Sequence, residues 1–181
     1  MATPFQSLAG QLLVSHPLQR DENFCESAVL LFSHDKADGA MGVIINRPFG
    51  RMLGEAQATF ASTPLSGVPL QLGGPVATDR MAFGGWKFPV KGPADIRYGV
   101  TQEEAPALAG DASFRLFAYI GYSGWSAGQL ENEIRLGAWV VCPFEAAFAE
   151  LEGDDLWKKL IIHHRPDLRL AMDSPDNPGL N

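Results

Sequence analysis

Residues 121–133 read GYSGWSAGQLENE and join the most apolar strand of the sequence to a helix. Gly121 and Gly124 permit backbone angles that other residues avoid, which favours a tight turn. Ser126 stands three residues before Gln129, the spacing of a capping box, so we expect the Ser126 hydroxyl to cap the helix. The stretch therefore predicts a strand, a turn and a helix in succession.

The strand that leads into this turn is predicted to be central. In SFRLFAYIGY, residues 113–122, apolar side chains occupy both alternating faces, as in a strand that is covered on both sides. Glycine- and proline-rich turns separate further short strands. These are residues 11–17, 24–33, 39–48, 69–76, 80–90, 94–100 and 137–143.

Helices are expected mainly near the C-terminal end. Residues 50–60 are a weak helix candidate, and residues 101–110 begin with a capping box. Residues 144–151 repeat apolar side chains at helical spacing, and a second amphipathic helix ends at His164. Hairpin-linked strands followed by helices predict an α+β fold with one domain, residues 1–164, and a loose C-terminal tail, residues 165–181.

Composition and charge exclude several classes of protein. The 181 residues carry a net charge of −7, and Lys158-Lys159 is the only basic cluster, so we expect no direct DNA binding and no basic membrane-surface helix. No apolar run approaches the roughly 18 residues that span a bilayer, and no secretory leader is visible. Cys25 and Cys142 are more typical of buried thiols than of a disulfide framework, which favours the cytoplasm.

An ordered set of segments resembles the YqgE/AlgH family of bacterial proteins. The segments are LLVSHP, SAVLLFSHD, GAMGVIINRP, LGGPV, IRYGV, GYSGWSAGQLENEI, GAWVVCP and LWKKLI, within residues 11–162. The resemblance implies a single-domain α+β fold with a bent, bifurcated, mixed β-sheet and flanking helices. It also implies a label of transcriptional regulator, but no established catalytic activity. Relatives more usually carry alanine at the position of Ser123.

Three turns supply a candidate ligand site. The strand-to-helix joint offers Tyr122 and Trp125 together with the unpaired N–H groups of a helix start. Asn46 and Arg47 end another strand, where Pro48 keeps Arg47 extended. Gly73 and Gly74 form a flexible third turn. If these turns converge, the six residues frame a pocket for an acidic or aromatic ligand.

Catalytic alternatives are weaker. Residues 121–124 match the first four positions of a nucleophile elbow, and Ser123, Asp154 and His163 follow the order of a hydrolase triad. However, Trp125 stands where a fifth small residue belongs. Cys25 is a second candidate nucleophile, although it lies in an apolar segment.

The histidines and cysteines show no metal-ligand spacing, so we expect no metal and no cofactor. Our hypothesis is a non-catalytic cytoplasmic regulator that binds a protein partner or a small acidic ligand. The alternatives are a DNA-binding transcriptional regulator and a hydrolase that uses Ser123 or Cys25. The sequence leaves the partner and the oligomeric state open.

Overall fold

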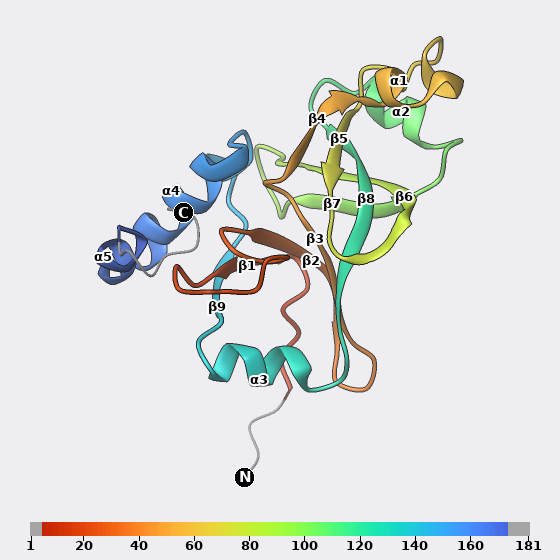
Figure 1. Cartoon of the computed structure of the whole chain (residues 1–181). Helices are drawn as coiled ribbons and strands as arrows, with labels where there is room; N and C mark the ends of the chain where they lie inside the picture. The colour runs from red at the N-terminus through yellow and green to blue at the C-terminus, as the bar shows by residue number, and fades with distance from the viewer. Residues whose placement is uncertain (1–4, 174–181) are drawn as a thin grey trace.

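Strand β8 (Arg115–Trp125) connects the two halves of the sheet (Figure 1). Its first part pairs with β5 (Pro69–Leu72) and β6 (Val76–Lys87), and its last three residues pair with β3 (Gly39–Ile44). Both faces of β8 are buried in the computed structural model, which describes residues 5–173. The predicted central strand is therefore confirmed.

The sheet is mixed and mostly antiparallel. Its strands follow the order β4-β5-β8-β3-β2-β1-β9, with β6 paired to β8 and β7 paired to β6. Among the strand pairs of residues 5–173, only β5–β8 is parallel. The remaining strands are β1 (Gln11–Ser15), β2 (Ala28–Asp35), β4 (Pro48–Met52), β7 (Asp95–Val100) and β9 (Trp139–Pro143). The α-helices are α1 (Leu53–Ala56), α2 (Ala105–Ala109), α3 (Gln129–Arg135), α4 (Gly153–His164) and α5 (Arg169–Met172). The α+β prediction is confirmed.

The sheet divides at Gly73, directly after β5. The Gly73 N–H donates to the Ile120 carbonyl oxygen at 2.8 Å, and the Gly73 carbonyl oxygen accepts from the Ile44 N–H at 2.9 Å. Gly73 thus lies between β8 and β3. Beyond this point β8 runs on to Trp125 paired directly with β3, whereas β5 has ended at Leu72. The expected bifurcation of the sheet has its branch point at this residue.

Three apolar clusters fill the layers between sheet and helices. The largest lies between β1–β2–β3 and the face of β6 and β8 that carries Trp86, Phe117 and Tyr119, and α4 covers its side. A second cluster packs α1 and α2 on the opposite face of β8, and a third packs α3 against β1–β3. Figure 1 shows α1 and α2 at one end of the molecule and α3 at the other. No described helix is both long enough and apolar enough to cross a bilayer.

The predicted turn at residues 121–125 is wrong, because these residues continue β8. Ser123 pairs with Gly42 and Trp125 with Ala40, so the edge of β3 supplies backbone partners that prolong the strand. The helix begins only at Gln129, after Gly128 in a left-handed conformation. The Ser126 hydroxyl donates to Gln129 Oε1 instead of accepting an N–H, and no side-chain hydrogen bond caps α3, whose N-cap residue is Gly128.

Two further predictions near the C-terminal end are corrected. Residues 144–151 form only a 3₁₀ turn, Ala146–Phe148, although Phe148 is buried as its apolar spacing indicated. Residues 165–181 are not wholly a loose tail, because Pro166–Leu168 and α5 are helical and Met172 packs into the largest cluster. Residues 174–181 lie outside the described part of the chain. Residues 50–60, the weak helix candidate, contribute to β4, α1 and the 3₁₀ turn Ala58–Phe60.

Candidate functional site

Gly73 and Gly74 do not form an open turn, because their backbone packs directly against the backbone of Gly121 and Tyr122 in β8. A Cβ at Gly73 would lie 2.4 Å from the Gly121 carbonyl oxygen, and one at Gly74 would lie 2.3 Å from the Tyr122 carbonyl oxygen. Only glycine allows the two chain segments to approach this closely. Residues 73–74 and 121–122 therefore do lie together, but backbone fills the space between them.

Asn46 is a buried structural residue. Its Oδ1 accepts from the Ala28 N–H at 2.8 Å, and its Nδ2 donates to the carbonyl oxygens of Glu26 and Gly153 at 2.9 and 3.2 Å. Only 4% of Asn46 is exposed. The side chain therefore joins the start of β2 to the start of α4.

Arg47 also bonds to the backbone. Its two terminal nitrogens donate to the carbonyl oxygens of Asn23 and Cys25, the latter at 2.8 Å, and hold the turn that precedes β2. Arg47 and Gly74 do line one small cavity of about 220 Å³. The guanidinium that the sequence suggested for an acidic ligand is thus already partnered by carbonyl groups.

Trp125 lies in the core, away from that cavity. Its Nε1 donates to Glu133 Oε2 at 2.9 Å, and the same oxygen accepts from Trp139 Nε1 at 2.8 Å. Tyr122 is half-buried against the largest cluster. The structure therefore brings Arg47, Gly73 and Gly74 close together, whereas Tyr122 and Trp125 are not among the residues that line the cavity.

The candidate nucleophiles occupy structural positions. Ser123 is fully buried, and its Oγ donates to the Gly73 carbonyl oxygen at 3.1 Å. Cys25 lies in the turn that precedes β2 and is partly exposed. Within residues 5–173, no hydrogen bond joins a histidine to either residue.

Histidines serve other purposes in the described part of the chain. His34 Nδ1 accepts from the Leu8 N–H at 3.0 Å, and its Nε2 lies 3.1 Å from Glu131 Oε1. His34 thereby fastens the N-terminal segment to β2 and α3. Across residues 5–173, no three His, Cys, Asp or Glu side chains gather in a group that could hold a metal ion.

A groove of about 960 Å³ lies along strand β7 and is here named the β7 groove. In the described chain, β7 pairs with β6 and with no other strand, so its second edge is unpaired. That edge runs between β2 and β3 on one side and α2 on the other (Figure 1). The groove is lined by Gly10, Leu31, Phe32, Ser33, Met41, Ala94, Ile96, Arg97, Tyr98, Gly99, Val100, Glu104, Ala107 and Leu108.

One wall of the β7 groove is aromatic and apolar. Phe32 of β2 stacks on Tyr98 of β7, with ring centroids 4.3 Å apart and planes 13° from parallel. Met41 and Ile96 extend the same wall. Burial raises the pKa of Tyr98, so its hydroxyl stays neutral at physiological pH.

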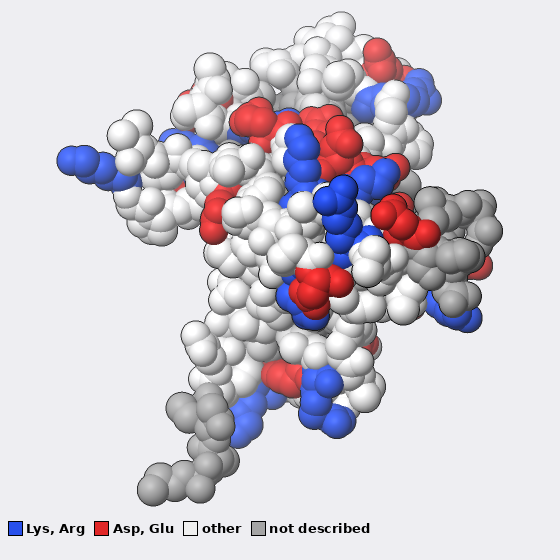
Figure 2. All heavy atoms as spheres, turned by 90° about the vertical axis from the view of Figure 1, so that its left-hand side faces the viewer, with Lys and Arg blue, Asp and Glu red and all other residues white. Residues whose placement is uncertain are grey.

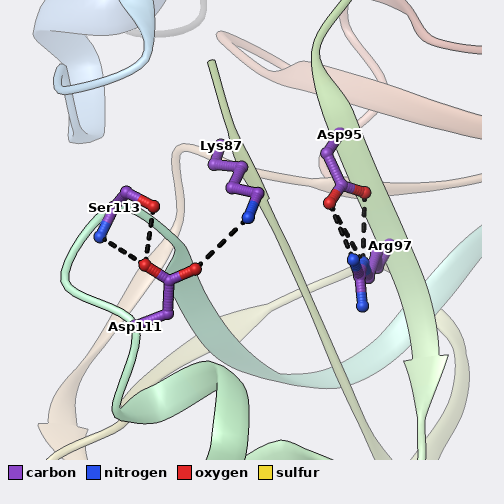
Figure 3. Close-up of polar contacts among 5 residues, drawn as sticks. All are labelled: Lys87, Asp95, Arg97, Asp111 and Ser113. Carbon is purple, nitrogen blue, oxygen red and sulfur yellow. Dashed lines mark hydrogen bonds and ion pairs between the residues drawn. The ribbon is translucent and has the colours of Figure 1, made fainter. Parts of the chain in front are cut away.

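Arg97 and Glu104 are the charged residues that line the other side of the groove, and Arg97 belongs to a set of paired charges (Figure 3). Arg97 donates to both carboxylate oxygens of Asp95, and Lys87 Nζ lies 3.3 Å from Asp111 Oδ2. These hydrogen bonds from Arg97 lower the pKa of Asp95. Most cations here are thus already paired with carboxylates of the same chain.

Sequence reasoning missed this groove. Residues 94–100 were correctly expected to form a strand, but nothing in ADIRYGV indicates that one edge of it remains unpaired. The nearest signal is Gly99, whose φ of 70° marks a bulge opposite Phe83 and Gly84. Bulges are frequent on edge strands.

Comparison with known proteins identifies the family to which the chain belongs. The fold and the groove define an α+β protein with a bifurcated sheet and one unpaired strand edge. The sequence profile of the AlgH-like family matches residues 12–169, and the chain belongs to this family. It is 34% identical to a UPF0301 protein of Streptomyces coelicolor, over 99% of this chain and 98% of that protein. A UPF0301 protein of Legionella pneumophila is 31% identical over 84% and 87% of the two chains.

Solved structures share the fold. The solution structure of the AlgH protein from Pseudomonas aeruginosa aligns with a TM-score of 0.65 and 25% identity, over 91% of this chain and 92% of that one. The crystal structure of a protein from Corynebacterium diphtheriae aligns with a TM-score of 0.67 and 23% identity, over 95% and 94% of the chains. The family resemblance found in the sequence is confirmed.

Proposed function

We propose that this protein is a non-catalytic cytoplasmic regulator that binds a partner protein in the β7 groove. The observation that carries the proposal is the edge of β7 that no strand of the described chain pairs with, and that borders the β7 groove. An unpaired edge presents backbone N–H and C=O groups, and an extended segment of another protein can pair with them. The two walls then contact its alternating side chains.

A protein partner is favoured over the other ligands considered. Arg47 is bonded to two carbonyl oxygens, which removes the main support for a small acidic ligand. On the side that carries α4 and α5, Lys and Arg are interspersed with Asp and Glu and form no continuous basic patch (Figure 2). Duplex DNA is bound mainly through clustered cations, so this face does not favour a DNA-binding regulator.

Two observations bear on catalysis and location. Ser123 has no exposed surface, and its hydroxyl already donates to a backbone carbonyl, which is the wrong arrangement for a nucleophile. Cys25 and Cys142 are both unbridged, as in proteins of reducing compartments. Burial also raises the pKa of Cys142 to about 12, so that thiol stays protonated and unreactive.

The test is site-specific photo-crosslinking in living cells. Ala107 and Ala109 are both exposed on α2, but only Ala107 lines the groove. A crosslinking residue at position 107 is expected to trap a partner segment, and one at position 109 to trap none. A synthetic peptide of that segment should bind Ala107→Arg about tenfold more weakly than Ala109→Arg. Equal binding to both variants would contradict the proposal.

A further inference from the structure

We infer that the segment bound by β7 is an extended strand whose apolar residues alternate with lysine or arginine. This inference rests on the proposed function and adds the chemistry of the partner. It follows from a difference between the two walls of the β7 groove. In a strand, successive side chains point to opposite faces, so each wall contacts every second residue of the added strand.

The wall formed by β2 and β3 selects apolar side chains. Phe32 of β2 and Met41 of β3 line it together with Ile96 and Tyr98 of β7, and Tyr98 is held against Phe32 by ring stacking. Ile96 and Tyr98 also pack on the largest apolar cluster beneath the groove. Aliphatic or aromatic residues of the partner would extend this cluster. The removal of their apolar surface from water would be the main favourable contribution to binding.

The wall formed by α2 offers a carboxylate that makes no ion pair within the described residues, although the charge of Arg97 lies close enough to help lower its pKa. Asp95 is paired with Arg97, and Asp111 is paired with Lys87 (Figure 3). Glu104 also lines the groove, yet none of the ion pairs among residues 5–173 includes it. A lysine or arginine of the partner would therefore meet its counter-ion at Glu104.

Glu104 is held in place and charged. Its Oε2 accepts from the N–H and the hydroxyl of Thr101, at 3.1 and 3.0 Å, in the capping box of α2. These bonds lower the pKa of Glu104, so the carboxylate is ionised at neutral pH. A fixed anion beside an unpaired strand edge is complementary to a cation on an added strand.

The other two edge strands offer less. Residues 48–52 of β4 are exposed throughout, so no wall flanks them, and β4 pairs with β5 only irregularly. The edge of β9 borders a cavity of about 490 Å³, half the volume of the β7 groove, with Arg165 in its lining. The lining of this cavity includes no carboxylate, so it offers a basic segment no counter-ion.

The experiment selects, from a displayed library of random peptides, those that bind the full-length protein. The expected consensus alternates apolar and basic residues, and the enriched peptides should slow hydrogen exchange of the β7 amides. Glu104→Gln keeps the hydrogen-bonding geometry of the capping box but removes the charge. It should lower the affinity of the enriched peptides about threefold to fivefold, as expected for the loss of an exposed ion pair, and remove the salt dependence of binding. Glu103→Gln, at an exposed position outside the groove lining, should leave both unchanged.

The outcomes separate the inference from the proposed function. Peptides that require the groove but lack basic residues, or that bind Glu104→Gln as tightly as wild type, would overturn the inference alone. An absence of enrichment, or enriched peptides that bind Ala107→Arg normally, would overturn both. A consensus of alternating apolar and acidic residues would likewise overturn the inference.

Discussion

The hydroxyl of Ser123 donates a hydrogen bond of 3.1 Å to the carbonyl oxygen of Gly73, a residue 50 positions earlier in the chain. The same oxygen accepts the N–H of Ile44 at 2.9 Å. Three strands are therefore joined at one backbone group, at the branch point of the sheet. A serine that resembles a nucleophile in the sequence is a structural donor in the fold.

Replacement of this serine should be mild. In Ser123→Ala the Gly73 carbonyl keeps its bond from Ile44, so no buried acceptor is left unpaired. We expect a loss of about 1 kcal/mol in the free energy of unfolding, measured by urea denaturation. An activated serine-hydrolase probe should label neither wild type nor variant, because Ser123 is fully buried. Labelling that disappears in Ser123→Ala would contradict the structural role.

Gly73→Ala should be far more damaging. Its Cβ would lie 2.4 Å from the Gly121 carbonyl oxygen, and both groups belong to backbone that is fixed by strand pairing. We expect a loss of about 3 kcal/mol in the free energy of unfolding. Gly67→Ala is the matched control, because a Cβ at Gly67 meets nothing within 4 Å. Similar denaturation midpoints for the two variants would show that the branch point can relax.

Arg47→Ala should destabilise the fold by about 2 kcal/mol, more than the 0.5 kcal/mol expected of a surface arginine. The reason is that two backbone carbonyls, of Asn23 and Cys25, lose a charged donor. Arg20→Ala, at an exposed position, is the control. Urea denaturation distinguishes the two, and equal stability of the variants would mean that water replaces the guanidinium without penalty.

The two side chains that link Ser126 to the start of α3 should contribute unequally to stability. Gln129 Oε1 accepts the N–H of Ser126 at 3.1 Å, whereas the Ser126 hydroxyl caps no helix N–H. Gln129 Nε2 also donates to Glu133 Oε1 at 2.9 Å, so we expect Gln129→Ala to cost about 1 kcal/mol and Ser126→Ala less than about 0.5 kcal/mol. Thermal denaturation of both variants tests this order. The reverse order would restore the Ser126 cap that the sequence predicted.

Asp111 should show a pKa far below that of an ordinary aspartate. Two hydrogen bonds from Ser113 and a contact with Lys87 lower the pKa of Asp111 to about 2 (Figure 3). Because the folded-state pKa is depressed, the stabilisation is complete above the ordinary pKa of about 4 and is lost as pH falls toward 2. Carboxyl NMR titration should show a higher pKa in Ser113→Ala, with a smaller rise in Lys87→Ala. An unchanged titration in Ser113→Ala would rule out the hydrogen bond from the Ser113 hydroxyl to Asp111 in solution.

The sequence by itself determined much of the local structure. Alternating apolar residues identified the β8 strand, and the pair Thr101 and Glu104 identified the capping box that the structure contains. The inward residues of α4, Leu156, Trp157, Leu160 and Ile161, were also correct. These features depend on neighbours within a few residues, and short-range sterics and hydrogen bonding determine them.

Only the tertiary structure decided which segments meet. Residues 121–125 became strand instead of turn because β3 pairs with them, and Arg47 lost its predicted freedom because the Asn23–Cys25 turn folds onto it. The β7 groove exists because β7 has one strand neighbour in the described chain and faces β2 and α2 across its other edge. Pairing partners and unpaired edges arise from contacts between distant residues, which no local pattern encodes.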